Sequence, residues 1–162
     1  KMIHAKELFV DQLKRAPTAS TVIRPTGFFS DMLEFLDMAK KGRVYLFGTG
    51  RHIINPIHGK DLAEVCVKAI EQTQQEIGVG GPVEYTYRQI AELAFRALHK
   101  KASIATVPLW MKRAMLAVMR TCTSVKTYGP VEFLMTVLTM NIVGTPYGKE
   151  GLQHFFEQHA RN

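Results

Sequence analysis

A chain of 162 residues and 18.3 kDa, 46% hydrophobic and 22% charged, can bury one hydrophobic core and has the composition of an ordinary globular domain. Its 21 basic and 14 acidic residues give a formal charge of +7, which could attract phosphates, nucleic acid or an anionic membrane. The cations are spread in ones and twos near expected helix ends, which is typical of solvated surface charge, so we expect no nucleic-acid partner. No apolar run reaches 18 residues, so we expect no membrane span.

In the first half of the chain, apolar residues at helical spacing alternate with short β-branched runs. The run that stops at Pro25 is typical of a buried strand, because proline cannot donate to a ladder and biases the residue before it away from helix. The expected elements are a helix over 2–14, a strand over 21–24, a helix ending near 41, a strand over 43–47, an extended segment over 53–57 and a helix over 62–72.

The second half continues the alternation. Thr86 and Gln89 form a plausible capping box for a helix, and Pro108 suits the first turn of another. A nearly uncharged helix follows over 130–140, so we expect it to be buried or packed on a partner. The remaining expected elements are strands over 76–80 and 103–107 and a short helix over 149–159. Together these patterns predict a single α/β domain over 1–162 with parallel pairing.

Several common sites have no signature here. No Gly-x-Gly-x-x-Gly joins a first strand to a first helix, and the turn at 48–50 leads to no helix, so the chain lacks a phosphate-binding loop. Cys66 and Cys122 have no CxxC spacing, so we expect reduced structural thiols in an intracellular, cytoplasmic protein and no metal site. The start at Lys1 indicates a piece of a longer polypeptide.

Four motifs in order resemble the carboxyl-terminal half of extended and atypical short-chain dehydrogenases/reductases, the NAD(P)-binding, NmrA-like and epimerase-like branch. Residues 22–29 resemble the sixth Rossmann strand with its Arg-Pro exit, and residues 55–63 resemble the return from the substrate domain. Residues 78–82 and 85–100 resemble the following strand and helix. The resemblance implies the carboxyl-terminal part of a Rossmann-like parallel sheet, a small substrate lobe and a helix-rich carboxyl terminus.

The resemblance also implies site residues. Lys6 would be the catalytic lysine, although Met2 stands where the family has its tyrosine and a thioether cannot transfer a proton; His4 lies on another helical face. The cofactor would contact Pro25, Thr26, Gly27 and Phe28. The substrate would contact Phe29, Met32, Asn55 and His58.

Each of these residues also has a structural interpretation. Lys6 could be a solvated lysine, the loop after Pro25 a simple turn, and Phe29 and Met32 plain core. His58 could be a hydrogen-bonded structural histidine. Arg24 could bind phosphate or pair with a carboxylate. The family's arginine for sugar nucleotides would fall near Ile54, which disfavours a nucleotide-sugar epimerase.

Two functions follow from the resemblance. The first is the substrate-lobe part of an NAD(P)-dependent oxidoreductase for a small-molecule substrate, with NAD or NADP bound mainly by a missing amino-terminal half. The second is a non-catalytic NAD(P)-sensing or scaffolding protein of the NmrA type. Its protein partner would be that amino-terminal half or another copy in a homo-oligomer.

Overall fold

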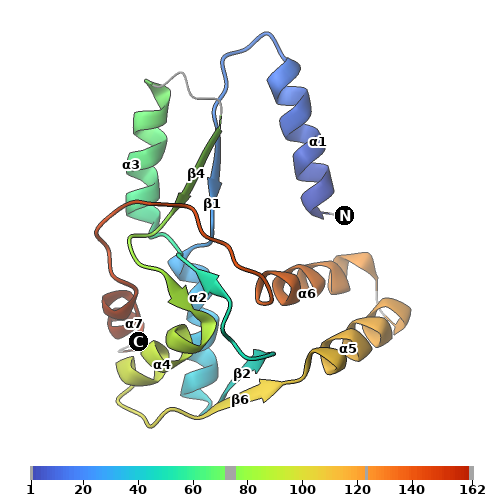
Figure 1. Cartoon of the computed structure of the whole chain (residues 1–162), viewed down its shortest axis with the longest axis vertical. Coiled ribbons are helices and arrows are strands. Elements are labelled where there is room, and N and C mark those ends of the chain that lie inside the picture. Colours follow the sequence, from blue (N-terminus) through green and yellow to red (C-terminus); the bar gives the residue numbers. More distant parts are fainter. Residues whose placement is uncertain (1, 72–75, 123, 161–162) are drawn as a thin grey trace.

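The computed structural model describes residues 2–71, 76–122 and 124–160, in which helices alternate with short strands (Figure 1). The expected α/β class is confirmed. The helices are α1 (Met2–Arg15), α2 (Phe29–Lys40), α3 (Gly59–Ile70), α4 (Tyr87–Ala97), α5 (Leu109–Cys122), α6 (Val125–Val137) and α7 (Leu152–Ala160). The strands are β1 (Val22–Pro25), β2 (Val44–Phe47), β3 (Ile53–Ile54), β4 (Glu76–Gly80), β5 (Tyr85–Thr86), β6 (Ile104–Val107) and β7 (Thr145–Pro146).

The strands pair in three small sheets. β1, β4 and β7 form a parallel sheet in that order, with Ile23 opposite Ile77. β2 and β6 form a second parallel pair, whereas β3 and β5 are antiparallel. The sequence did not predict β5 or β7, because a two-residue strand is too short to show a period of two.

Two helices start earlier than their patterns predict. α3 begins at Gly59, where His58 is the N-cap, and its expected end at residue 72 lies outside the described residues. α6 begins at Val125 and ends at Val137, so Pro130 lies inside it rather than at its start. The helix therefore gives up one main-chain donor there.

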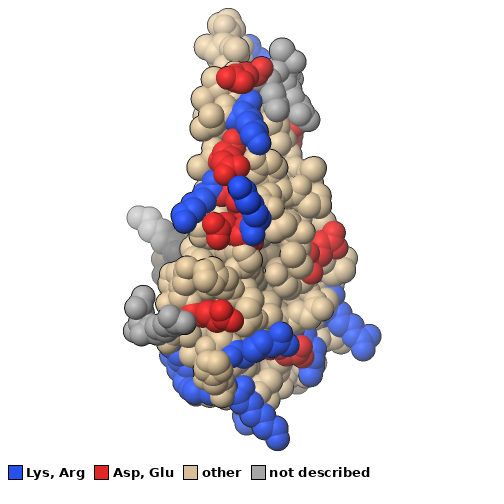
Figure 2. Space-filling view, turned by 90° about the vertical axis from the view of Figure 1, so that its left-hand side faces the viewer, with Lys and Arg blue, Asp and Glu red and all other residues tan. Residues whose placement is uncertain are grey.

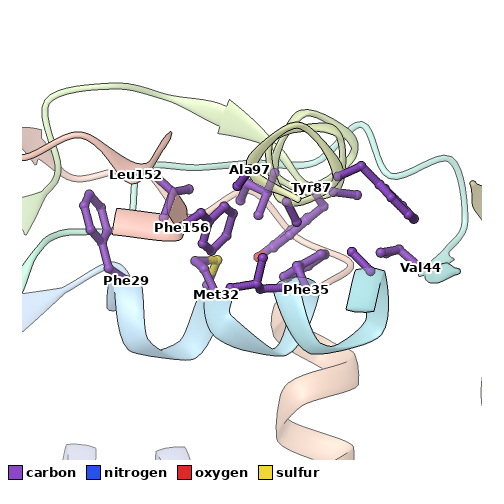
Figure 3. Packing of buried hydrophobic residues seen from close by; sticks show 14 of the residues in the cluster. Phe29, Met32, Phe35, Val44, Tyr87, Ala97, Leu152 and Phe156 are labelled. Atoms are coloured by element: carbon purple, nitrogen blue, oxygen red, sulfur yellow. The ribbon is translucent and has the colours of Figure 1, made fainter. Parts of the chain in front are cut away.

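The main core lies where α2, α4 and α7 pack together, and Figure 3 shows its side chains pointing toward one another. Apolar residues three and four positions apart place one stripe of each helix against the others. Thr86 and Gln89 form the expected capping box at the start of α4. The fully or almost fully buried members include Phe29, Phe35, Leu36, Tyr87, Ile90, Phe95, Leu152 and Phe156.

A smaller core lies between the β1–β4 sheet and α3, around Ile57, Val65 and Val79. In Figure 1, α3 lies on one side of this sheet and α1 on the other. All four β1 residues are only half-buried, so the prediction of a buried strand is wrong: within the described residues β1 is an edge strand. Cys66 on α3 is a free thiol and is exposed, not part of a buried face. The side chain of Cys122 is not among those that the structure describes.

Helices α5 and α6 form a hairpin that extends away from the main core (Figure 1). Lys112 on α5 joins the two, since its Nζ donates to the Met135 carbonyl at 2.7 Å and to Thr139 Oγ1 at 2.8 Å. The Tyr87 hydroxyl donates to the Val137 carbonyl at 3.1 Å, and burial raises the pKa of Tyr87 to about 12. The burial expected of α6 is found only in part: Met135 is buried, whereas Phe133 is exposed.

Candidate functional site

The carboxyl ends of β1 and β4 are joined through Asn55. Its Nδ2 donates to the carbonyls of Gly81 at 3.1 Å and Gly144 at 3.0 Å, and its Oδ1 accepts the Gly144 N–H at 3.0 Å. The Asn55 carbonyl accepts from Thr26 Oγ1 at 2.6 Å. A Cβ at Gly80 would overlap the Asn55 amide, so the strand end needs glycine to come this close. We call this hydrogen-bonded group the Asn55 junction.

The side chain of Asn55, which was expected to contact substrate, is fully used by the Asn55 junction. The residue is 0% exposed, and both amide donors and the side-chain oxygen are engaged by main-chain groups. These contacts are structural. A substrate contact by Asn55 stays a prediction.

The loop after β1 is anchored on both sides and reaches the surface between its anchors. The Thr26 N–H donates to the Val79 carbonyl at 3.0 Å, and the Ile57 N–H donates to the Gly27 carbonyl at 2.8 Å. In the part of the chain that the structure describes, the Gly27 N–H has no partner, and Phe28 is 37% exposed. The predicted cofactor residues Pro25, Thr26, Gly27 and Phe28 thus lie together at the carboxyl end of β1, where open α/β sheets bind ligands.

His58 caps α3. Its Nδ1 accepts the Lys60 N–H at 3.2 Å, and its ring meets those of Phe29 and Phe155 at centroid distances of 5.5 and 5.6 Å. These contacts match the interpretation of His58 as a hydrogen-bonded structural histidine. Its role toward substrate stays a prediction.

Phe29 and Met32 occupy the main core rather than an open cleft. Phe29 is 2% exposed, and Met32 is buried. The Phe29 ring lies 5.5 Å from that of Phe155 of α7, and Figure 3 shows Met32 beside Phe156. Helical spacing alone predicts which residues share a face but not what covers that face. The contacts of Phe29 and Met32 therefore match their structural interpretation as core residues.

Asp61 is a buried residue whose role the sequence did not reveal. Its carboxylate accepts the N–H groups of Lys149 at 3.3 Å and Glu150 at 3.1 Å, and so attaches the segment before α7 to α3. Gly148 has a φ of +98°, and a Cβ there would overlap the carboxylate. Asp61 lies in the first turn of a predicted helix, a usual place for a carboxylate, but no sequence pattern indicates its distant partner.

Lys6 is exposed in the first half of α1. The side chains of Met2 and His4 lie outside the description, so the predicted arrangement around the absent tyrosine stays a prediction. The next residue, Glu7, connects this part of α1 to β1 through Arg24.

Arg24 pairs with two carboxylates, as one of its two interpretations predicts. Its Nη1 and Nη2 lie 2.6 and 2.8 Å from the Glu7 carboxylate oxygens, and its Nε bonds Glu76 of β4. Lys14 lies 2.9 Å from Glu76. Hydrogen bonding to Arg24 lowers the pKa of Glu7, and bonds from Lys14 and Arg24 lower the pKa of Glu76. We call this group the Arg24 cluster; its two carboxylates engage all three guanidinium nitrogens of Arg24.

The Arg24 cluster should make stability depend on acid. Because the folded-state pKa values of Glu7 and Glu76 lie below the ordinary value of 4.5, their contribution is present above that pH and is lost as pH falls through the folded values. We expect the urea midpoint of Arg24→Gln to depend less on pH below about 4.5 than that of the parent chain.

Arg88→Gln is the matched control for this experiment. It removes an exposed ion pair with Glu92, in which the two charged atoms lie 3.4 Å apart on α4. Its midpoint should follow the parent's acid dependence closely. An Arg24→Gln profile that runs parallel to the parent's would contradict the role of the cluster.

A groove of about 700 Å³ lies at the opposite, amino end of β1. It is lined by the segment before β1 and by Cys66, Ala69 and Ile70 of α3. In the described ranges no group of three or more His, Cys, Asp or Glu is placed to hold a metal ion. Nor does any described helix combine the length and apolar character that crossing a bilayer requires.

Two plant reductases are similar to the chain in sequence, although no family model matches it. The chain is 27% identical to the chloroplastic divinyl chlorophyllide a 8-vinyl-reductase of Cucumis sativus, over 85% of this chain and 39% of that protein. For the enzyme of the same name from Zea mays the identity is 27%, over 74% of this chain and 31% of that protein. The chain thus spans well under half the length of these relatives.

A solved structure shares the fold. DesIV, the dTDP-glucose 4,6-dehydratase of Streptomyces venezuelae with NAD and TYD bound, superposes with a TM-score of 0.50 at 16% identity, over 62% of this chain and 35% of that one. At this identity the likeness concerns the fold alone. The chain is therefore an α/β protein with a Rossmann-like neighbour, similar in sequence to vinyl reductases.

Proposed function

We propose that this chain is the carboxyl-terminal, substrate-lobe part of an NAD(P)-dependent reductase that acts on a vinyl group of a chlorophyllide-like tetrapyrrole. The observation that carries the proposal is the similarity to two 8-vinyl-reductases over most of the chain. Neither relative is named as a regulator, so nothing here supports the alternative of a non-catalytic sensor. Because both relatives are named chloroplastic, we propose a plastid rather than the expected cytoplasm.

The loop after β1 fits contact with a nicotinamide. Gly27 offers an N–H without a partner among the described residues, and Phe28 offers a partly exposed ring beside it. A donor and an apolar surface are what a carboxamide on an aromatic ring requires. The pyrophosphate would be held elsewhere, since this sequence has no glycine-rich strand–turn–helix.

Reduction of a vinyl group is compatible with Met2 at the position where the family has its tyrosine. The nicotinamide supplies hydride when bound, and hydride plus a proton convert the vinyl group to an ethyl group while NAD(P)H becomes NAD(P)+. In a conjugated macrocycle the added electron pair delocalises, so less depends on a positioned acid than in carbonyl reduction. The thioether of Met2 cannot supply such an acid. Lys6 would then hold the cofactor rather than tune a phenol.

The test is turnover by the intact protein that contains this chain, given NADPH or NADH and divinyl chlorophyllide a. We expect a product heavier by two hydrogens, consumed nucleotide and, for Lys6→Met, a kcat/KM lower by about tenfold or more. Lys60→Met changes an exposed lysine on α3 and should leave kcat/KM unchanged.

The possible failures are distinct. No reduction of the vinyl group with either nucleotide overturns the proposed function. Normal turnover by Lys6→Met overturns only the role given to that lysine.

A further inference from the structure

We infer that α5 and the segment before it form a docking surface for an anionic lipid membrane, on which α5 lies without crossing. The inference is independent of the proposed reaction. It depends on two observations, the exposed apolar side chains of α5 and the sign of the charge of the segment that contains them.

The first observation is an apolar surface on α5 that the described residues leave open. Trp110 is 68% exposed, and Leu109, Met111 and Met115 are each exposed by more than two fifths. Leu116 and Lys112 lie on the other side of the helix, toward α6. Single exposed apolar residues are common, but here four lie within seven positions of one helix. We call these four residues the α5 patch.

The second observation is the positive charge of the sequence segment that contains this patch. No acidic residue occurs between Glu92 and Glu132, whereas seven of the chain's 21 lysines and arginines lie there. The rest of the chain therefore carries as many acidic as basic residues, and this segment accounts for the whole formal charge of +7. Its basic members are Arg96, Lys100, Lys101, Lys112, Arg113, Arg120 and Lys126.

The charge distinguishes the α5 patch from other exposed apolar residues. On α3, Val67 and Ile70 are 65% and 83% exposed, but they stand among Glu64, Lys68 and Glu71. Figure 2, which views the side of the molecule that carries α3, shows acidic and basic side chains alternating along its upper part. α3 thus has apolar residues without a net charge, whereas α5 has both.

A helix that exposes Trp, Leu and Met side chains within a basic segment has the composition of helices that lie in a membrane interface. Tryptophan prefers the headgroup level, and each Lys or Arg near an anionic surface adds attraction. With 14 residues, α5 is too short to span a bilayer. Lipid headgroups with negative charge therefore fit this surface better than an uncharged apolar partner would.

The test is co-sedimentation of the 162-residue chain, and of the intact protein that contains it, with vesicles of phosphatidylcholine alone or mixed with phosphatidylglycerol. We expect binding to the mixed vesicles that weakens at high salt, with the emission of Trp110, the chain's single tryptophan, moving to shorter wavelength. The triple substitution Trp110→Ser, Met111→Ser and Met115→Ser should weaken binding by at least about tenfold.

The matched control is Val67→Ser with Ile70→Ser on α3, which removes comparably exposed apolar groups and should bind like the parent. A charge variant, Lys100→Glu with Lys101→Glu, should lose affinity for the mixed vesicles. Circular dichroism establishes that each variant is folded. All five changed apolar positions are exposed, so the substitutions leave the core untouched.

Three results would overturn the inference. The chain could fail to bind the mixed vesicles, or the α3 variant could lose as much affinity as the α5 variant. Alternatively, Trp110 emission could already be blue-shifted without lipid in a dimer whose formation depends on concentration, which would assign the patch to a second copy.

Discussion

Replacing Asn55 by alanine is expected to lower the free energy of unfolding by about 3 kcal/mol, because it leaves buried main-chain groups without partners. The carbonyls of Gly81 and Gly144 lose their donor, and the Gly144 N–H loses its acceptor. Alanine has no group that can replace these bonds, and the site is closed to solvent because Asn55 is 0% exposed. Urea unfolding followed by circular dichroism measures the loss.

Asn141→Ala is the matched control. The Asn141 side chain also accepts a main-chain N–H, that of Ile53 at 3.0 Å, but the residue is exposed, so water can replace the lost acceptor. We expect a loss of about 1 kcal/mol or less. Equal losses in the two variants would show that the Asn55 junction contributes no more than a surface hydrogen bond.

Phe29→Ala should cost about 3–5 kcal/mol, the range for deleting a buried aromatic side chain. The ring packs between α2 and α7, 5.5 Å from the Phe155 ring, and its removal leaves a cavity in the main core. The sequence predicted a substrate contact here. A residue with that role alone would change KM and leave the urea midpoint nearly unaltered.

The neighbouring Phe28 gives the matched comparison, since it has the same side chain and is 37% exposed. Phe28→Ala should cost about 1 kcal/mol and, in the intact protein, weaken binding of NAD(P)H. Phe29→Ala with an unchanged urea midpoint would contradict its placement in the core. Unchanged nucleotide affinity of Phe28→Ala would count against the cofactor contact.

Local patterns predicted most elements because their signals are local. The helical spacing in α2 and α4, the β-branched run of β1 and the capping box at Thr86 each specify the conformation of a few adjacent residues. The element most poorly placed was α6. There an apolar run with a proline inside has no charged face to mark its limits.

The site residues show the same difference between local and distant information. The sequence placed Pro25, Thr26, Gly27 and Phe28 in one loop, and the structure keeps them together because they are consecutive. It could not tell that Phe29 faces α7, or that Arg24 would meet Glu7 and Glu76. Such pairings depend on what lies opposite a residue, which a one-dimensional period does not contain.

By itself, then, the amino-acid order determined the α/β class, the order of all helices and of the strands other than β5 and β7, the loop after β1 and the concentration of positive charge between residues 93 and 131. Only the tertiary structure decided that Asn55 bonds Gly81 and Gly144, that Asp61 holds the segment before α7, and that the α5 patch stays open. The physical reason is the distance along the chain over which each effect acts. Propensity and periodicity act over neighbouring residues, whereas burial and hydrogen-bond partners are set by segments that are distant in the chain and meet only in the folded molecule.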